Sequence, residues 1–354
     1  MQNSPLHRSI IWLGSASGIV VILALLKLVA HLLAAGNYGL FIDELYFLAT
    51  SQHLAWGYVD MPPGAAILAW LAHHLFGEAV FGLHLLPALL GAATVVFTGI
   101  MVRMLGGGRF AQLISGLGMV FANVYWLGHS YLSMNALEPL IWMGCAMILI
   151  YMVQTGEKRW WLAFGVLAGL GLLNKYTMLG FGFALVAGLA ITPARKLLWS
   201  RWLILGGVLA GLIFLPNLVW NIQHGFPILE LQANIRQAGR NVQLSPLQFF
   251  LDQVVFMNPF NLPIWLGGLA WLFSHPKGKT YRFLGWSYLI ILGLLLAVEG
   301  RTYYLAPAYP MLFAAGGALF ESLQASLTLR SRRWKAVRVA YPVILLFFGL
   351  LQVP

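Results

Sequence analysis

Long runs of apolar residues recur along the whole chain and constrain its fold more than any other feature. Many are roughly 18 to 25 residues long, enough to cross a hydrocarbon core about 30 Å thick. Only 9% of the 354 residues are charged, whereas a soluble domain carries about 25%. A soluble globular enzyme and a disordered chain are therefore excluded. The net charge of +11 comes from 21 Lys and Arg spread too thinly to form a nucleic-acid groove. The sequence predicts an all-α polytopic membrane protein.

The apolar runs lie between charged residues and Pro or Gly breaks, and they predict about eleven transmembrane helices. Residues 64–77 are left open as an interfacial helix or a short span. The predicted spans are 12–34, 80–101, 110–127, 133–153, 160–174, 177–193, 202–220, 255–273, 283–298, 304–321 and 337–353.

The basic residues predict which ends of these spans face the cytoplasm, because cytoplasmic loops carry an excess of Lys and Arg. With the N-terminus inside, 16 of the 21 basic residues fall on the cytoplasmic side. These are Arg8, Arg103, Arg109, Lys158, Arg159, Arg195, Lys196, Arg201, Lys277, Lys279, Arg282, Arg330, Arg332, Arg333, Lys335 and Arg338. Eight of the ten acids fall on or near the outer side, namely Asp43, Glu44, Asp60, Glu78, Glu138, Glu230, Asp252 and Glu299. This clustering predicts a polar site at the outer rim.

Two outer segments, 36–79 and 221–254, are long and have amphipathic helical spacing. One apolar face is formed by Phe41, Leu45 and Leu48, and the other by Ile228, Leu231 and Ile235. Helices of this kind lie along a membrane surface and can roof a cavity. We expect residues 1–354 to form a single transmembrane domain without a C-terminal soluble domain.

Three carboxylates in the first outer segment are candidates for chemistry. Asp43 and Glu44 are neighbours, so on a helix they point about 100° apart, and only one can face a given point. Asp43 shares its face with Tyr46. Asp60 precedes Met61 and two prolines, which favour an extended backbone. The alternatives are a solvated first-turn pair for Asp43 and Glu44 and a helix N-cap for Asp60.

Three further charges lie at or near the outer ends of later spans. Glu138 lies within an apolar run, so it is expected to face protein or water rather than lipid. Lys175 and Arg301 are candidates for holding an anion, since a guanidinium can grip a phosphate bidentately. Tyr304 follows Arg301 closely. The alternatives are helix packing for Glu138, snorkelling for Lys175 and an interfacial aromatic belt around Tyr304.

No motif indicates a metal or nucleotide site. The single cysteine, Cys145, excludes an intramolecular disulfide, and the nine histidines show no ligand spacing. A divalent cation held partly by Asp43, Asp60 and His53 stays open, and no cofactor is otherwise expected.

Six motifs in order resemble the family 39 glycosyltransferases of the GT-C superfamily, which include protein O-mannosyltransferases and are similar to bacterial aminoarabinose transferases. The motifs are Asp43-Glu44, Tyr58 to Pro63, Met134 to Pro139, Asn174-Lys175, Pro216 to Pro227, and Arg301 to Pro310. Met61 departs from the pattern, because a basic residue or histidine is common there.

The resemblance implies a reaction. Such enzymes take a sugar from a polyprenyl-phosphate carrier at the outer face and transfer it, usually with inversion, to a lipid, glycan or protein hydroxyl. It places the base at Asp43, a later acid at Asp60, and the phosphate-binding cations at Lys175 and Arg301. The expected location is the bacterial inner membrane, with an extracytoplasmic active site and a cytoplasmic N-terminus. The candidate catalytic residues are Asp43, Asp60 and Glu44, and the candidate substrate-binding residues are Lys175, Arg301, Tyr304, Glu138, Tyr46 and Asn135.

Two other functions stay open from the sequence. A lipid-linked sugar flippase or transporter also needs an amphipathic cavity, although transporters usually show internal repeats and broken spans near the midplane. A non-catalytic membrane scaffold is the second alternative.

Overall fold

The computed structural model describes residues 16–77, 79–239, 244–327 and 332–351, and every regular element in them is a helix. Arg8, Glu78, Arg240 and Arg330 lie outside the described residues. The α-helices are α2 (Ala16–Ala34), α3 (Ile42–Ser51), α4 (Gly64–Phe76), α5 (Val80–Met104), α6 (Arg109–Phe121), α7 (Asn123–Ser130), α8 (Met134–Thr155), α9 (Trp161–Asn174), α10 (Thr177–Ala190), α11 (Arg201–Gln223), α12 (Pro227–Gln237), α13 (Pro246–Phe256), α14 (Leu262–Ser274), α15 (Arg282–Ala297), α16 (Tyr309–Leu327) and α17 (Arg332–Leu350). Five short 3₁₀ helices connect them: η1 (Lys158–Trp160), η2 (Pro193–Leu197), η3 (Pro259–Asn261), η4 (Gly278–Tyr281) and η5 (Thr302–Ala308).

The described helices confirm the all-α membrane fold. Four helical stretches are long and apolar enough to cross a bilayer: α5, α8, α11, and η4 continued by α15. The bent pair α6 and α7 counts as a fifth if it forms one span. The other predicted spans contain helices that are shorter or less uniformly apolar.

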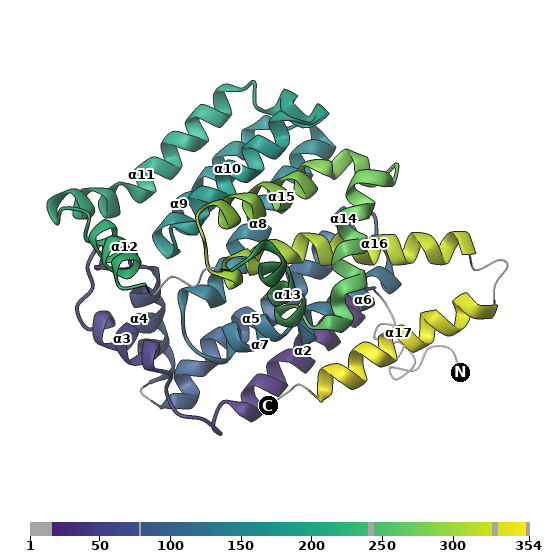
Figure 1. Ribbon diagram of the computed structural model, residues 1–354, viewed down its shortest axis with the longest axis horizontal. Helices are drawn as coiled ribbons and strands as arrows, with labels where there is room; N and C mark the ends of the chain where they lie inside the picture. The colour runs from purple at the N-terminus through teal and green to yellow at the C-terminus, as the bar shows by residue number, and fades with distance from the viewer. Residues whose placement is uncertain (1–15, 78, 240–243, 328–331, 352–354) are drawn as a thin grey trace, which may run out of the picture.

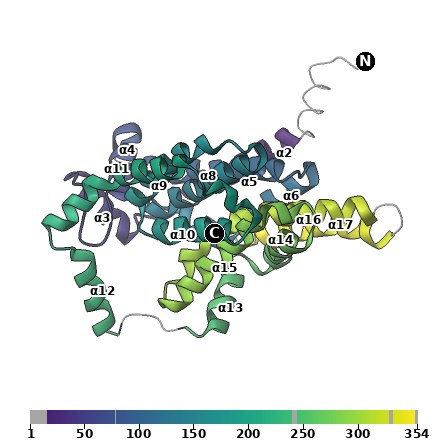
Figure 2. The ribbon, with the colours of Figure 1, turned by 90° about the horizontal axis from the view of Figure 1, so that it is seen from above.

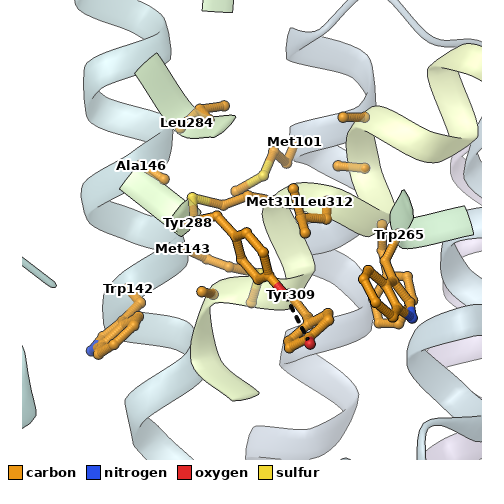
Figure 3. Packing of buried hydrophobic residues seen from close by; sticks show 14 of the residues in the cluster. Met101, Trp142, Met143, Ala146, Trp265, Leu284, Tyr288, Tyr309, Met311 and Leu312 are labelled. Carbon is orange, nitrogen blue, oxygen red and sulfur yellow. Dashed lines mark hydrogen bonds between the residues drawn. The ribbon is translucent and has the colours of Figure 1, made fainter. Parts of the chain in front are cut away.

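The helices pack against one another along their lengths (Figure 1). Their buried side chains form one large apolar core and a smaller cluster around Phe47 and Met61. α9 lies against α11, α14 against α16, α10 against α15, and α2 against α5. In Figure 3, Tyr288 and Tyr309 meet within this core, and the Tyr288 hydroxyl lies 3.0 Å from the Tyr309 hydroxyl. Trp142 and Trp265 are each 1% exposed nearby. Pairing the two hydroxyls satisfies polar groups that would be costly to bury alone.

One predicted span, 110–127, is broken in the structure. α6 and α7 meet at Ala122 with a bend of 59°. The break frees backbone carbonyls, and two buried asparagines bind carbonyls there. Asn258 Nδ2 donates to the Phe121 carbonyl at 3.1 Å, and Asn261 Nδ2 donates to the Gly118 carbonyl at 3.0 Å. Broken helices survive at membrane depth only when such groups are satisfied by the protein.

Two other predicted spans are not continuous α-helices in the structure. Residues 255–273 are divided, because α13 ends at Phe256 and Asn258 has φ of 67°, after which η3 and α14 follow. Residues 304–321 start as η5 rather than as an α-helix. Pro307 lies inside η5 and lacks the N–H that a regular α-helix would use.

The first outer segment forms α3 and α4, and the second forms α12 and α13. Figure 1 and Figure 2 both place α12 at the same end of the molecule as α3 and α4. On α3 the buried residues include Glu44 and Phe47, whereas Phe41 and Leu45 are exposed and Leu48 is half-buried. The predicted apolar face is therefore not the face that packs inward, because Glu44 is accommodated by polar partners.

In the second of these segments, the apolar face predicted for α12 is the partly buried face of the helix. On α12, Ile228, Leu231 and Ile235 are all half-buried, while Leu229 on another face is 65% exposed. The helix begins at Pro227, whose fixed φ suits the first helical position.

Candidate functional site

A cavity of about 500 Å³ opens where α3, α7, α8 and η5 meet. Four of the residues predicted from the sequence lie on its wall: Asp43, Asn135, Glu138 and Arg301. The full lining is Phe41, Asp43, Asn123, Val124, Tyr125, Leu127, Gly128, His129, Tyr131, Asn135, Glu138, Pro139, Phe256, Arg301, Tyr303, Ala306 and Pro307.

Asp43 lies in the first turn of α3, and its side chain is exposed on the cavity wall. A carboxylate is stabilised there because the unpaired N–H groups of a helix N-terminus carry partial positive charge. Tyr131 lines the same cavity, and burial together with the negative charge of Asp43 raises the pKa of its phenol. The Asp43 side chain is thus within reach of a molecule that enters the cavity.

Glu44, the neighbour of Asp43, points into the protein and is 1% exposed. Its carboxylate accepts backbone N–H bonds from Phe41 at 2.8 Å and from Leu132 at 2.8 Å, and His84 Nε2 lies 3.3 Å away. These contacts tie the start of α3 to the segment before α8 and to α5. The two adjacent acids therefore have different surroundings. Asp43 lies on the cavity wall, whereas Glu44 is buried among hydrogen-bond partners.

Glu138, on the cavity wall, forms a buried ion pair with Lys175, which is not among the lining residues. Lys175 Nζ donates to Glu138 Oε2 at 2.9 Å and to Asn135 Oδ1 at 2.8 Å, and the Thr177 hydroxyl donates to Glu138 Oε1. The same ammonium lies 4.4 Å from the ring centroid of Tyr304. Lys175 lies in the turn between α9 and α10. Its hydrogen bonds join this turn to α8, and its contact with Tyr304 joins it to η5.

Arg301 presents a cation to the cavity from the start of η5. Its side chain is exposed, and no carboxylate among the described residues lies within ion-pair distance. Tyr303 next to it is partly buried, and burial and then the adjacent Tyr304 raise the pKa of its phenol, which therefore stays protonated. The cavity consequently holds an unpaired guanidinium and a hydrogen-bond donor together with the carboxylate of Asp43.

Asp60 and Tyr46 lie together but off this wall. The Tyr46 hydroxyl donates to Asp60 Oδ1 at 2.7 Å, and both side chains are exposed. Partial burial, followed by the hydrogen bond to Asp60, raises the pKa of Tyr46. Met61, directly after Asp60, is 1% exposed and fixes this loop through apolar packing. Asp60 is thus not among the described residues that line the cavity of about 500 Å³ with Asp43.

Sequence reasoning missed the contribution of α7. Its break from α6 turns Asn123, Tyr125, Leu127 and His129 to the cavity. A second, largely apolar cavity of about 670 Å³ adjoins the first and shares Phe41, Asn123, Leu127 and Tyr131 with it. The run also contains Gln112 and Ser115, so the polar Asn123 within it did not by itself predict a bend.

A metal site was left open, with Asp43, Asp60 and His53 as partial ligands. In the described part of the chain, no three His, Cys, Asp or Glu side chains are grouped so that they could hold a metal ion. The charged side chains that line the cavity include the carboxylates of Asp43 and Glu138 and the guanidinium of Arg301.

Residues 60–220 match the family described as dolichyl-phosphate-mannose-protein mannosyltransferase. Over 256 residues the chain is 25% identical to the lipid A galacturonosyltransferase RgtD of Rhizobium johnstonii, covering 69% of this chain and 52% of that protein. Over 334 residues it is 23% identical to the undecaprenyl phosphate-alpha-4-amino-4-deoxy-L-arabinose arabinosyl transferase 1 of Pseudomonas fluorescens, covering 84% and 59%. The chain spans about half the length of the curated relatives it matches.

Solved structures show the same fold. ArnT from Cupriavidus metallidurans, bound to undecaprenyl phosphate, superposes with a TM-score of 0.73 at 18% identity, covering 95% of this chain and 65% of that one. The archaeal oligosaccharyltransferase AglB from Archaeoglobus fulgidus superposes with a TM-score of 0.59 at 14% identity, covering 96% and 55%. The resemblance predicted from the six motifs is confirmed: the chain is an integral membrane protein of the GT-C fold, similar to the family 39 glycosyltransferases.

Proposed function

We propose that this chain is a membrane glycosyltransferase that moves a sugar from a polyprenyl-phosphate donor to a lipid, glycan or protein hydroxyl. The observation that carries the proposal is the placement of Asp43 and the unpaired Arg301 on the wall of one cavity. A transfer from a phosphate carrier needs both a base for the acceptor and a cation for the leaving group. The relatives named above favour undecaprenyl phosphate as the carrier and a lipid as the acceptor.

The proposed reaction uses Asp43 as the general base. The acceptor oxygen attacks the anomeric carbon of the sugar, its proton passes to the Asp43 carboxylate, and the bond from the sugar to the carrier phosphate breaks. General base catalysis of this kind contributes roughly 10²–10⁴-fold to the rate.

Arg301 is proposed to hold the carrier phosphate, which leaves with the electron pair of the broken bond. A planar guanidinium can bind two phosphate oxygens at once, and a positioned cation stabilises the charge that develops in the transition state. A prenyl phosphate is already a competent leaving group, so no general acid is required. The adjoining apolar cavity is a suitable place for the first prenyl units.

The other predicted residues receive supporting roles in this proposal. Lys175, Glu138 and Asn135 hold the wall from which Arg301 and Tyr303 project, with Tyr304 packed on the ammonium. Glu44 positions Asp43 by anchoring the first turn of α3. Asp60 and Tyr46 form an exposed polar pair that is available to an acceptor hydroxyl at the approach to the site.

Purified chain reconstituted into vesicles tests the proposal. Undecaprenyl phosphate carrying a radiolabelled pentose or hexose is added with lipid A or a short glycan, and label on the acceptor is measured by thin-layer chromatography. We expect transfer that requires the lipid-linked donor. Turnover with a nucleotide sugar alone would contradict the proposal. Movement of the labelled donor between leaflets without transfer would favour the flippase, and inertness in both assays would favour the scaffold.

A further inference from the structure

We propose that a basic cleft at the opposite end of α8 binds the phosphate headgroup of an anionic phospholipid. The cleft has a volume of about 450 Å³ and lies between the last turn of α8, η2 and the start of α15. Its walls are formed by Met152, Val153, Gly156, Pro193, Ala194, Lys196, Leu197, Lys279, Thr280 and Arg282. This site is separate from the candidate active site and does not depend on the proposed reaction.

The cleft concentrates positive charge without an acid to neutralise it. Lys196, Lys279 and Arg282 all line it, and no aspartate or glutamate does. None of the three lies within ion-pair distance of a carboxylate among the described residues. Arg282 Nε donates to the Lys279 carbonyl at 3.2 Å, which ties the Arg282 side chain to the backbone of η4. Three unpaired cations around one hollow favour a phosphate group as the occupant.

Two other basic residues at the same end, Lys158 and Arg159, have partners of their own. Glu157 is paired with Arg159 at 2.9 Å, and Lys158 Nζ donates to the Trp199 carbonyl at 3.0 Å. These basic residues lie outside the cleft lining. Lys196, Lys279 and Arg282, by contrast, line the cleft and have no carboxylate partner among the described residues.

The position of the cleft indicates a lipid rather than a free anion. Asn135 at the candidate active site and Val153 at the cleft are separated by eighteen residues of α8, or roughly 27 Å along a helix axis, so the cleft lies near the other membrane surface. Trp199, which follows η2, is 83% exposed, as expected for an aromatic anchor at the lipid–water interface. Basic pockets between transmembrane helices at this level suit anionic headgroups.

The wall of the cleft also suits the part of a lipid below its headgroup. Met152, Val153 and Leu197 provide apolar surface beside the three cations. A phospholipid can place its phosphate against Lys196, Lys279 and Arg282 and its glycerol and upper acyl carbons against the apolar wall. Inorganic phosphate would gain only the charged contacts, so we commit to phosphatidylglycerol-like lipid as the occupant.

Native mass spectrometry of the full chain in detergent tests this site, with phosphatidylglycerol and phosphatidylcholine as the probes. We expect at least fivefold preference for phosphatidylglycerol. The double variant Lys196→Gln/Lys279→Gln should reduce phosphatidylglycerol affinity about tenfold. The control Arg109→Gln/Arg159→Gln removes the same charge from two exposed residues outside the cleft and should change it less than twofold.

Photo-crosslinking keeps the test decisive if a variant fails to fold. Wild-type chain with phosphatidylglycerol that carries a photoreactive group near the headgroup should be labelled within 193–197 and 279–282. Equal affinity for the two lipids, equal losses in both double variants, or labelling confined to other segments would overturn the proposal. Displacement of the lipid by millimolar inorganic phosphate would assign the cleft to a free anion and would also overturn it.

Discussion

Lys175 Nζ lies 2.9 Å from Glu138 Oε2, and this buried pair joins the turn between α9 and α10 to the first turns of α8. The Lys175 side chain is 11% exposed and the Glu138 side chain 3% exposed. Two charges at this depth are tolerated because each neutralises the other and because Asn135 and Thr177 complete their hydrogen bonds. The pair supports the cavity wall that carries Arg301.

Replacing Lys175 alone should lower the free energy of unfolding more than replacing both Lys175 and Glu138. Lys175→Met leaves the Glu138 carboxylate buried without its cation, which costs about 3–5 kcal/mol. Adding Glu138→Gln removes the stranded charge, so the double variant should be more stable than Lys175→Met alone. Thermal unfolding of the two single variants and the double variant in detergent measures this coupling, and strictly additive losses would show that the pair contributes no interaction energy.

Asp43→Asn should reduce turnover with a lipid-linked donor by roughly 10²-fold or more, because the amide cannot accept the acceptor proton. The amide keeps the size of the side chain, so folding and donor binding should stay near wild type. Steady-state rates at saturating donor provide the measurement. Glu230→Gln is the matched control, because Glu230 is an exposed carboxylate on α12 and is not part of the cavity lining. Near wild-type turnover of Asp43→Asn would reassign the base, and Asp60 would be tested next.

Arg301→Ala should act mainly on the donor. Loss of the guanidinium removes the counter-charge of the carrier phosphate, and we expect KM for the donor to rise about tenfold, which equals about 1.4 kcal/mol. Arg301→Lys should recover part of this loss, because it keeps the charge but not the planar fork. Donor titrations at fixed acceptor separate KM from kcat. Unchanged donor KM in Arg301→Ala would exclude a phosphate contact at this position.

Two neighbouring glycines of α11 should respond oppositely to alanine. A methyl group on Gly206 would lie 2.3 Å from the Trp161 carbonyl oxygen of α9, whereas nothing lies within 4 Å of one on Gly207. Gly206→Ala should therefore separate α9 from α11 at a cost of about 1–3 kcal/mol. Gly207→Ala should be neutral or should stabilise the helix by roughly 0.5–1 kcal/mol. Unfolding midpoints of the two variants provide the comparison, and equal midpoints would mean that the close contact of α9 and α11 contributes little.

The charge asymmetry predicts that α3 faces the outside and that η4 faces the cytoplasm. Cys145, the single cysteine, is buried, so the wild-type chain should give little background with a thiol reagent. His53 and Thr280 are both exposed and lie in these two regions. In intact cells an impermeant maleimide should label His53→Cys, and it should label Thr280→Cys only after lysis. The reverse pattern would invert the topology and place the cavity on the cytoplasmic side.

Much of the architecture was predictable because it depends on local composition. Helices α5, α8, α11 and α15 fall within a few residues of predicted spans, since an apolar run long enough to cross a bilayer must satisfy its backbone hydrogen bonds internally. Asp43, Glu138 and Arg301 were recognisable for a related reason. A charge at the edge of an apolar run is costly, so it is retained where it has a partner or a task.

The sequence by itself determined the membrane class, the approximate spans and the residues worth testing, because each follows from hydropathy and charge within a short window. Only the tertiary structure decided which of those residues share a cavity. Glu44 is buried and binds the Leu132 N–H, and Asp60 binds Tyr46 outside the cavity lining. The bend between α6 and α7 brings α7 to the cavity. These outcomes depend on hydrogen-bond partners far away in the chain, such as Leu132 for Glu44 and Asn258 for the break. No local pattern encodes such partners, because they are brought together only when the helices pack.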